Sequence, residues 1–132
     1  MKRVVGIGGI FFKSKDPKAL QARYVKHLGL PITEDGYIVF QSNPEIKEHA
    51  VWSAFPEDTT YYQPSQKAFM FNYRVDDLVK LLEVLKEEGV QIVGEIMEET
   101  YGKFGWIMDP EGNKIELWEP VVEEFDKINK LD

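Results

Sequence analysis

A carboxylate between apolar neighbours is the first candidate for chemistry in this chain. In the strand expected at 114–119, Ile115 and Leu117 point to one face. Glu116 and Trp118 point to the other face. Burying a carboxylate is costly unless a partner group satisfies it. Glu116 is therefore either exposed to solvent or part of a site, where it would serve as a general base or a hydrogen-bond acceptor.

A polar pair on an earlier strand is the second candidate. Residues 67–75 alternate, so that one face carries an apolar row of Phe69, Phe71, Tyr73 and Val75. The opposite face carries Ala68, Met70, Asn72 and Arg74. Polar side chains opposite a dense apolar row indicate either a site that faces inward or exposure to solvent.

Aromatic side chains form the third group of candidates. Trp52, Trp106 and Trp118 offer flat apolar surfaces, and Tyr101 lies nearby in the sequence. A tryptophan on a strand either packs in the core or stacks against a planar ligand. Both alternatives stay open, so an aromatic or planar ligand is one expectation.

Composition excludes several classes of function. The chain has no cysteine, which excludes disulfides, thiolate chemistry and cysteine-built zinc sites. A net charge of −7 without a cluster of Lys and Arg argues against a nucleic-acid partner. No apolar run approaches the ~20 residues that span a bilayer, and no signal peptide is expected at the start. We therefore expect a cytoplasmic protein with no membrane partner.

The two histidines and the glycine-rich start are weaker signals. His27 falls in the last turn of an expected helix, where an imidazole suits the helix dipole. His49 begins an expected strand. Gly6-Ile7-Gly8-Gly9 lies inside a strand and lacks the spacing of a nucleotide-binding loop.

One pattern of elements occurs twice along the chain. In the first half, a strand at 4–13 precedes a helix from Asp16-Pro17 to Gly29, followed by strands at 30–33, 37–41 and 49–55. In the second half, a strand at 67–75 precedes a helix from Asp76-Asp77 to Gly89. Strands at 90–96, 103–108 and 114–119 follow, and a tight turn at 109–113 joins the last two.

This repetition predicts a single domain over 1–132 of α+β class, made of two tandem β-α-β-β-β units. Its parts are a first unit at 3–55, a linker at 56–66, a second unit at 67–120 and an acidic C-terminal tail at 121–132.

The duplicated pattern resembles the vicinal oxygen chelate superfamily, which includes glyoxalase I, bleomycin-resistance proteins, fosfomycin-resistance enzymes and extradiol dioxygenases. The most specific segment is Asp-Pro-Glu-Gly-Asn-Lys-Ile-Glu-Leu at 109–117. Val75-Asp76-Asp77-Leu78 and Leu28-Gly29-Leu30 support it. The resemblance implies that each unit curls into half of an open barrel and that the two units enclose a central cavity.

The superfamily's metal-dependent enzymes imply up to four ligand positions. Here they fall on Gly9, Trp52, Met70 and Glu116. Only Glu116 offers a donor suited to a hard or borderline cation. This departure from the family pattern predicts that no cofactor is bound. The alternative is one divalent metal ion on Glu116, with substitute ligands from Glu95, Glu99 or water.

The resemblance also implies which side chains face the cavity. It places the strand at 67–75 beside the strand of Glu116, so that Arg74 and Glu116 could form a buried ion pair. That pair would either satisfy two buried charges, or hold a ligand oxygen on Arg74 while Glu116 acts as base or acceptor. A loop that folds over the cavity in this family adds Glu99 and Tyr101.

We therefore expect a glyoxalase/bleomycin-resistance-like protein that binds a small organic ligand without metal and forms a homodimer. The expected catalytic residues are Glu116 and Arg74. The expected ligand-binding residues are Trp52, Met70, Asn72, Glu99, Tyr101 and Trp118. The alternatives are a divalent-metal-dependent lyase or isomerase of the glyoxalase type, and a structural dimer without ligand.

Overall fold

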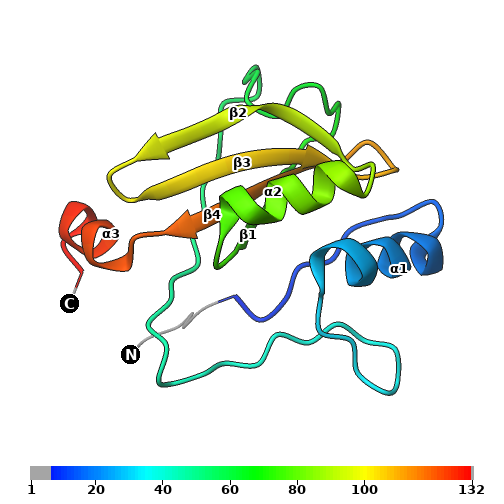
Figure 1. The fold of residues 1–132 in the computed structure, drawn as a ribbon, viewed down its shortest axis with the longest axis horizontal. Coiled ribbons are helices and arrows are strands. Elements are labelled where there is room, and N and C mark those ends of the chain that lie inside the picture. Colours follow the sequence, from blue (N-terminus) through cyan, green and yellow to red (C-terminus); the bar gives the residue numbers. More distant parts are fainter. Residues whose placement is uncertain (1–6, 132) are drawn as a thin grey trace.

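The computed structural model describes residues 7–131 of the chain (Figure 1). Its elements, in order, are α1 (Pro17–Leu28), β1 (Phe71–Arg74), α2 (Leu78–Glu87), β2 (Gln91–Glu99), β3 (Gly102–Met108), β4 (Lys114–Pro120) and α3 (Val122–Asn129). This mixture confirms the predicted α+β class. No helix among residues 7–131 is long and apolar enough to cross a membrane.

The four strands form one open mixed sheet in the order β1-β4-β3-β2. β1 runs parallel to β4, whereas β3 is antiparallel to both β4 and β2. The register sets Asn72 of β1 and Trp106 of β3 on either side of Glu116. The strands and helix predicted for the second unit are therefore present.

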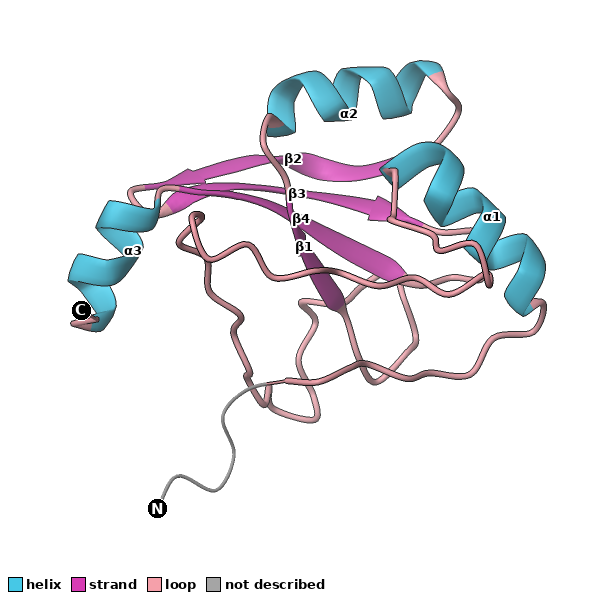
Figure 2. Ribbon diagram, turned by 90° about the horizontal axis from the view of Figure 1, so that it is seen from below, coloured by secondary structure: helices cyan, strands magenta, loops and turns pink. Residues whose placement is uncertain are grey.

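Helix α2 covers one face of this sheet (Figure 2). Asp77 caps the helix by accepting a hydrogen bond from the Lys80 amide, 3.1 Å away. The helix buries Leu78, Leu82 and Leu85 against the sheet. Gly105 permits the close approach, because a Cβ there would lie 2.7 Å from a methyl carbon of Leu82.

The turn between β3 and β4 is held by Asp109. Its Oδ1 accepts hydrogen bonds from the amides of Glu111 (2.8 Å) and Asn113 (2.9 Å). Gly112 has φ of 81°, a conformation that favours glycine. The sequence Asp-Pro-Glu-Gly-Asn therefore forms the predicted tight connection.

The same turn attaches α1 to the second unit. The Glu111 carboxylate accepts hydrogen bonds from the Ser14 hydroxyl and the Lys15 amide, both at 2.8 Å. The Tyr24 hydroxyl donates to Asp109 Oδ2 at 2.7 Å. Leu20 and Tyr24 join the apolar core beneath α2. The most specific motif of the chain thus joins its two halves.

The first half lacks the sheet expected for it among its described residues. Of the strands predicted there, 30–33 and 37–41 meet only at an isolated bridge between Ile32 and Ile38, and 49–55 has no strand pairing. Residues 4–6 of the predicted strand 4–13 lie outside the described residues, and 7–13 is not a strand. Apolar runs with β propensity form a ladder only when a neighbouring strand supplies backbone partners. Large apolar side chains here stay exposed, among them Phe11 (95%) and Trp52 (80%).

Candidate functional site

The face of the sheet turned away from α2, called the inner face below, carries the candidate site. Alternation along β4 directs Ile115 and Leu117 into the core beneath α2 and Glu116 to the inner face. The register adds Asn72 from β1 and Trp106 from β3. Three neighbouring strands thereby bring these polar and aromatic groups together.

Glu116 lies at the centre of this face and is 8% exposed. Its Oε2 accepts hydrogen bonds from the Tyr61 hydroxyl (2.6 Å) and from Trp106 Nε1 (2.8 Å). Its Oε1 accepts from Asn72 Nδ2 at 2.8 Å. All three donors are neutral, so hydrogen bonds rather than an ion pair offset the cost of burying this carboxylate.

Tyr61 comes from the predicted linker and lies over the site. Its ring meets Trp106 edge-on, with centroids 6.1 Å apart and planes at 85°. Lys114 Nζ donates to the Tyr61 carbonyl at 2.7 Å and lies 5.4 Å from the ring centroids of both Tyr61 and Trp106. These distances permit cation–π attraction. Tyr61 is thus bound to β4 at both its hydroxyl and its carbonyl.

The environment changes the proton affinity of two of these groups. Burial, and then the hydrogen bond to Glu116, raise the pKa of the Tyr61 hydroxyl. Burial lowers the pKa of Lys114, and the charge of Glu116 opposes that change. At neutral pH Tyr61 therefore remains a phenol that can donate its proton in a hydrogen bond.

The expected ion pair between Arg74 and Glu116 is not formed. Arg74 instead pairs with Glu48 at 3.1 Å, donates to the carbonyl of His49, and has a side chain 36% exposed. The reason is register: Asn72 is the residue level with Glu116, whereas Arg74 is level with Trp118. The neutral amide therefore occupies the place that the ion pair required.

The predicted aromatic residues near the C-terminal end pack together. Trp118 is 5% exposed and stacks on Phe104, with centroids 5.9 Å apart. Phe125 of α3 covers it at 5.3 Å, and Tyr101 meets Phe104 edge-on at 5.8 Å. Trp118 and Tyr101 thus lie in an aromatic cluster beneath α3, and a ligand-binding role for them stays a prediction.

Three other predicted residues are not among the donors to the Glu116 carboxylate. Trp52 is exposed in an extended segment of the first half. Glu99 is exposed at the end of β2, an outer strand separated from β4 by β3. Met70 is partly buried just before β1. A ligand-binding role for these three residues stays a prediction.

The residues at the family's metal-ligand positions do not fit a divalent ion. Gly9, Trp52 and Met70 supply no oxygen or nitrogen donor of the required kind. Both oxygens of Glu116 already accept hydrogen bonds. Residues 7–131 contain no group of three or more His, Asp or Glu side chains placed to hold a metal. Absence of metal from the protein stays a prediction.

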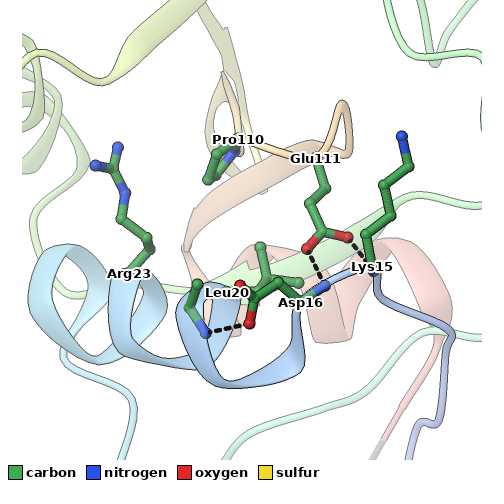
Figure 3. Close-up of a pocket in the computed structure, with 7 residues that line it drawn as sticks. Lys15, Asp16, Leu20, Arg23, Pro110 and Glu111 are labelled. Atoms are coloured by element: carbon green, nitrogen blue, oxygen red, sulfur yellow. Dashed lines mark hydrogen bonds between the residues drawn. The ribbon is translucent and has the colours of Figure 1, made fainter.

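Two surface grooves lie elsewhere. One of about 850 Å³ is lined by residues of 53–68, including Phe55 and Tyr62. The other, of about 420 Å³, lies between α1 and the turn after β3, where Glu111 reaches the start of the helix (Figure 3). Glu116 lines neither groove. In this structure Tyr61 covers its carboxylate instead.

The predicted site did not include two residues that the structure places around Glu116, namely Tyr61 and Lys114. Tyr61 stands in a linker without periodicity, so strand alternation could not assign it a face. The available signal was the aromatic pair Tyr61-Tyr62 in an otherwise polar segment. Lys114 shares the alternation of Glu116 and could have been added on that ground.

Comparison with known proteins identifies the family. Residues 7–117 match the model of the Glyoxalase/Bleomycin resistance protein/Dioxygenase superfamily. The chain therefore belongs to this superfamily, as its duplicated pattern indicates. No curated protein matches the chain.

Solved structures show the same fold at low sequence identity. A superfamily member from Sphaerobacter thermophilus has a TM-score of 0.55 and 19% identity, covering 88% of this chain and 98% of its own. A glyoxalase/dioxygenase from Nostoc punctiforme has a TM-score of 0.52 and 20% identity, covering 91% and 98%. A virulence protein from Salmonella typhimurium has a TM-score of 0.52 and 17% identity, covering 80% and 89%.

Proposed function

We propose that this protein binds a small organic ligand on the inner face of its sheet, with Glu116 as the principal acceptor and without a metal ion. The observation that carries the proposal is the buried Glu116 carboxylate, which accepts hydrogen bonds from three neutral donors. A ligand with a hydroxyl or N–H group can replace one of these donors without leaving a charge unpaired.

The surroundings of Glu116 support an organic ligand over a metal ion. Trp106 and Tyr61 supply aromatic surface, and Lys114 supplies a cation beside it. Small-molecule sites typically combine apolar walls with a few placed polar groups. Glu116 would also be the group able to take a proton from a bound ligand, if the site is catalytic.

A thermal-shift screen of small organic compounds tests this proposal, with NiCl2, ZnCl2 and MnCl2 as separate arms. Ligands that bind the folded state raise its melting temperature by mass action. We expect at least one organic compound to stabilise the wild type but not Glu116→Gln. The matched control is Glu98→Gln, which changes an exposed carboxylate on β2.

The screen has two outcomes against the proposal. Stabilisation by a divalent metal that disappears in Glu116→Gln would replace it with the metal-dependent lyase or isomerase. Organic compounds that stabilise wild type and Glu116→Gln equally would place binding away from the inner face.

We propose in addition that the chain forms a homodimer. The observation in favour is the apolar surface of the first half, where Phe11, Phe40 and Trp52 are at least 65% exposed. Apolar patches of this kind typically mark an interaction surface. β1 also pairs with β4 alone, so its outer edge is free to accept a strand among the residues described.

A further inference from the structure

Tyr61 occupies the candidate site as a small molecule would. Its hydroxyl donates to Glu116, its ring contacts Trp106, and its carbonyl accepts from Lys114. Three different side chains of the inner face therefore contact the hydroxyl donor, the flat ring and the carbonyl acceptor of Tyr61. The contacts of this one residue define the chemistry that the site recognises.

The segment that carries Tyr61 is not built into the sheet. The linker has no helix or strand, and its backbone amides bond within the linker: Thr59 to Pro56, Gln63 to Thr60 and Ser65 to Tyr62. Segments held by local bonds move at lower cost than strands. Tyr61 can therefore leave Glu116 without breaking a ladder hydrogen bond.

Space for a ligand adjoins Tyr61. Phe55 packs against the Tyr61 ring, with centroids 5.6 Å apart, and also lines the groove of about 850 Å³. Tyr62, the next residue, lines the same groove. A molecule in this groove is one aromatic ring away from the Glu116 site.

We infer that the ligand is a hydroxyaromatic compound whose phenol group takes the place of Tyr61 on Glu116. This inference rests on the proposed function and names the class of ligand. The ligand hydroxyl donates to Glu116 Oε2, and its ring lies against Trp106 and Lys114. An acceptor on the ligand, such as a carbonyl, accepts the hydrogen bond that Lys114 donates here to the Tyr61 carbonyl. Tyr61 is then an internal competitor that a ligand must displace.

Calorimetric titration with p-cresol and toluene tests this exchange. The wild type should bind p-cresol weakly, because Tyr61 competes. Tyr61→Ala should bind p-cresol about tenfold more tightly, and toluene about tenfold less tightly than p-cresol, because toluene has no donor for Glu116. Tyr61→Phe retains the ring without the hydroxyl, so its affinity for p-cresol should lie between that of the wild type and that of Tyr61→Ala. This variant tests the exchange if Tyr61→Ala fails to fold.

Matched variants locate the binding. In Tyr61→Ala/Glu116→Gln the preference for p-cresol over toluene should shrink, whereas Tyr61→Ala/Glu98→Gln should retain it. Tyr37→Ala should bind p-cresol as the wild type does, because Tyr37 is an exposed tyrosine of the first half that lines neither groove and is not among the donors to Glu116.

Several results would overturn the inference: no p-cresol binding by the wild type, equal binding of p-cresol and toluene by Tyr61→Ala, or a gain in Tyr37→Ala equal to that in Tyr61→Ala. If another organic compound still requires Glu116 in the thermal-shift screen, the proposed function stands and only the hydroxyaromatic ligand is wrong. If no compound requires Glu116, the proposed function itself falls.

Discussion

At the scale of single residues, Glu116 determines how the inner face behaves. Each of its oxygens is matched to N–H or O–H donors, so exchanging the carboxylate for an amide sets an NH2 group against a donor. We expect Glu116→Gln to lower the free energy of unfolding by about 1–3 kcal/mol. Urea unfolding measures this, and the exposed Glu98→Gln should change stability by less than about 0.5 kcal/mol. Equal midpoints for both variants would show that the hydrogen bonds to Glu116 do not hold.

Loss of the neutral Asn72 side chain should lower the stability of the protein more than loss of the charged Arg74 side chain. Asn72 donates to the buried Glu116, so Asn72→Ala should cost about 1–3 kcal/mol. Arg74 pairs with Glu48 at the surface, so Arg74→Ala should cost less than about 1 kcal/mol. The same urea experiment compares them. If Arg74→Ala lowered the stability more than Asn72→Ala, that result would contradict this register and favour an ion pair between Arg74 and Glu116.

Strand alternation predicted part of the site at this scale. It placed Asn72, Arg74, Glu116 and Trp118 on one face, and the pairing register agrees. It could not predict which of them meet, because a face contains several residues and only the register selects opposite pairs. Tyr61 was out of reach, since no periodic pattern places a side chain from an irregular linker.

At the scale of elements, the turn after β3 fixes the position of α1. Hydrogen bonds from the Lys15 amide first, and then from the Ser14 hydroxyl, lower the pKa of Glu111 below its ordinary value of 4.5. A carboxyl whose pKa is lowered by folding stabilises the folded state above its unfolded pKa. That stabilisation is lost as the pH falls through the lower, folded-state pKa.

The resulting prediction is that wild type and Glu111→Gln differ in stability at pH 7 and converge as the pH falls below 4.5. Urea midpoints measured from pH 7 downward test it. Glu87→Gln, on the exposed side of α2, should follow the wild type throughout. If the difference in stability between wild type and Glu111→Gln stayed constant with pH, the ionised carboxylate of Glu111 would not be what stabilises the position of α1.

Local signals predicted the helices well. Asp16 and Asp77 each cap a helix at the expected position, and Gly29 ends α1 with φ of 64°. Such caps act within a few residues, so the sequence alone specifies them. The tail at 121–132 was expected to be acidic, and it contains α3, whose Phe125 packs on Trp118.

At the scale of the whole molecule, the two halves predicted to be repeats differ in their secondary structure over the described residues. The repeat predicted the superfamily, and residues 7–117 match its model. It also predicted a sheet in the first half, where the described residues form α1 and extended segments. A helix satisfies its own backbone groups, whereas a strand depends on a neighbour, and neighbours cannot be read from one segment.

The exposed apolar surface predicts self-association. We expect light scattering at ~10 µM to report about twice the monomer mass of 15.3 kDa, because dimer interfaces of standard size hold at that concentration. Trp52→Glu should shift the protein toward monomer, because it buries a charge in the contact. Glu57→Gln, in the exposed linker, should remain dimeric. A monomeric wild type would contradict the proposed homodimer.

The most direct test of ligand binding at Glu116 is the indole N–H spectrum of the protein during titration with the best compound from the screen. Three tryptophans give three resolvable signals. Trp106 Nε1 donates to Glu116, whereas Trp52 is exposed in the first half. The account predicts that the Trp106 signal moves with ligand concentration and that the Trp52 signal stays in place. Movement of Trp52 with an unchanged Trp106 would contradict a binding site at Glu116.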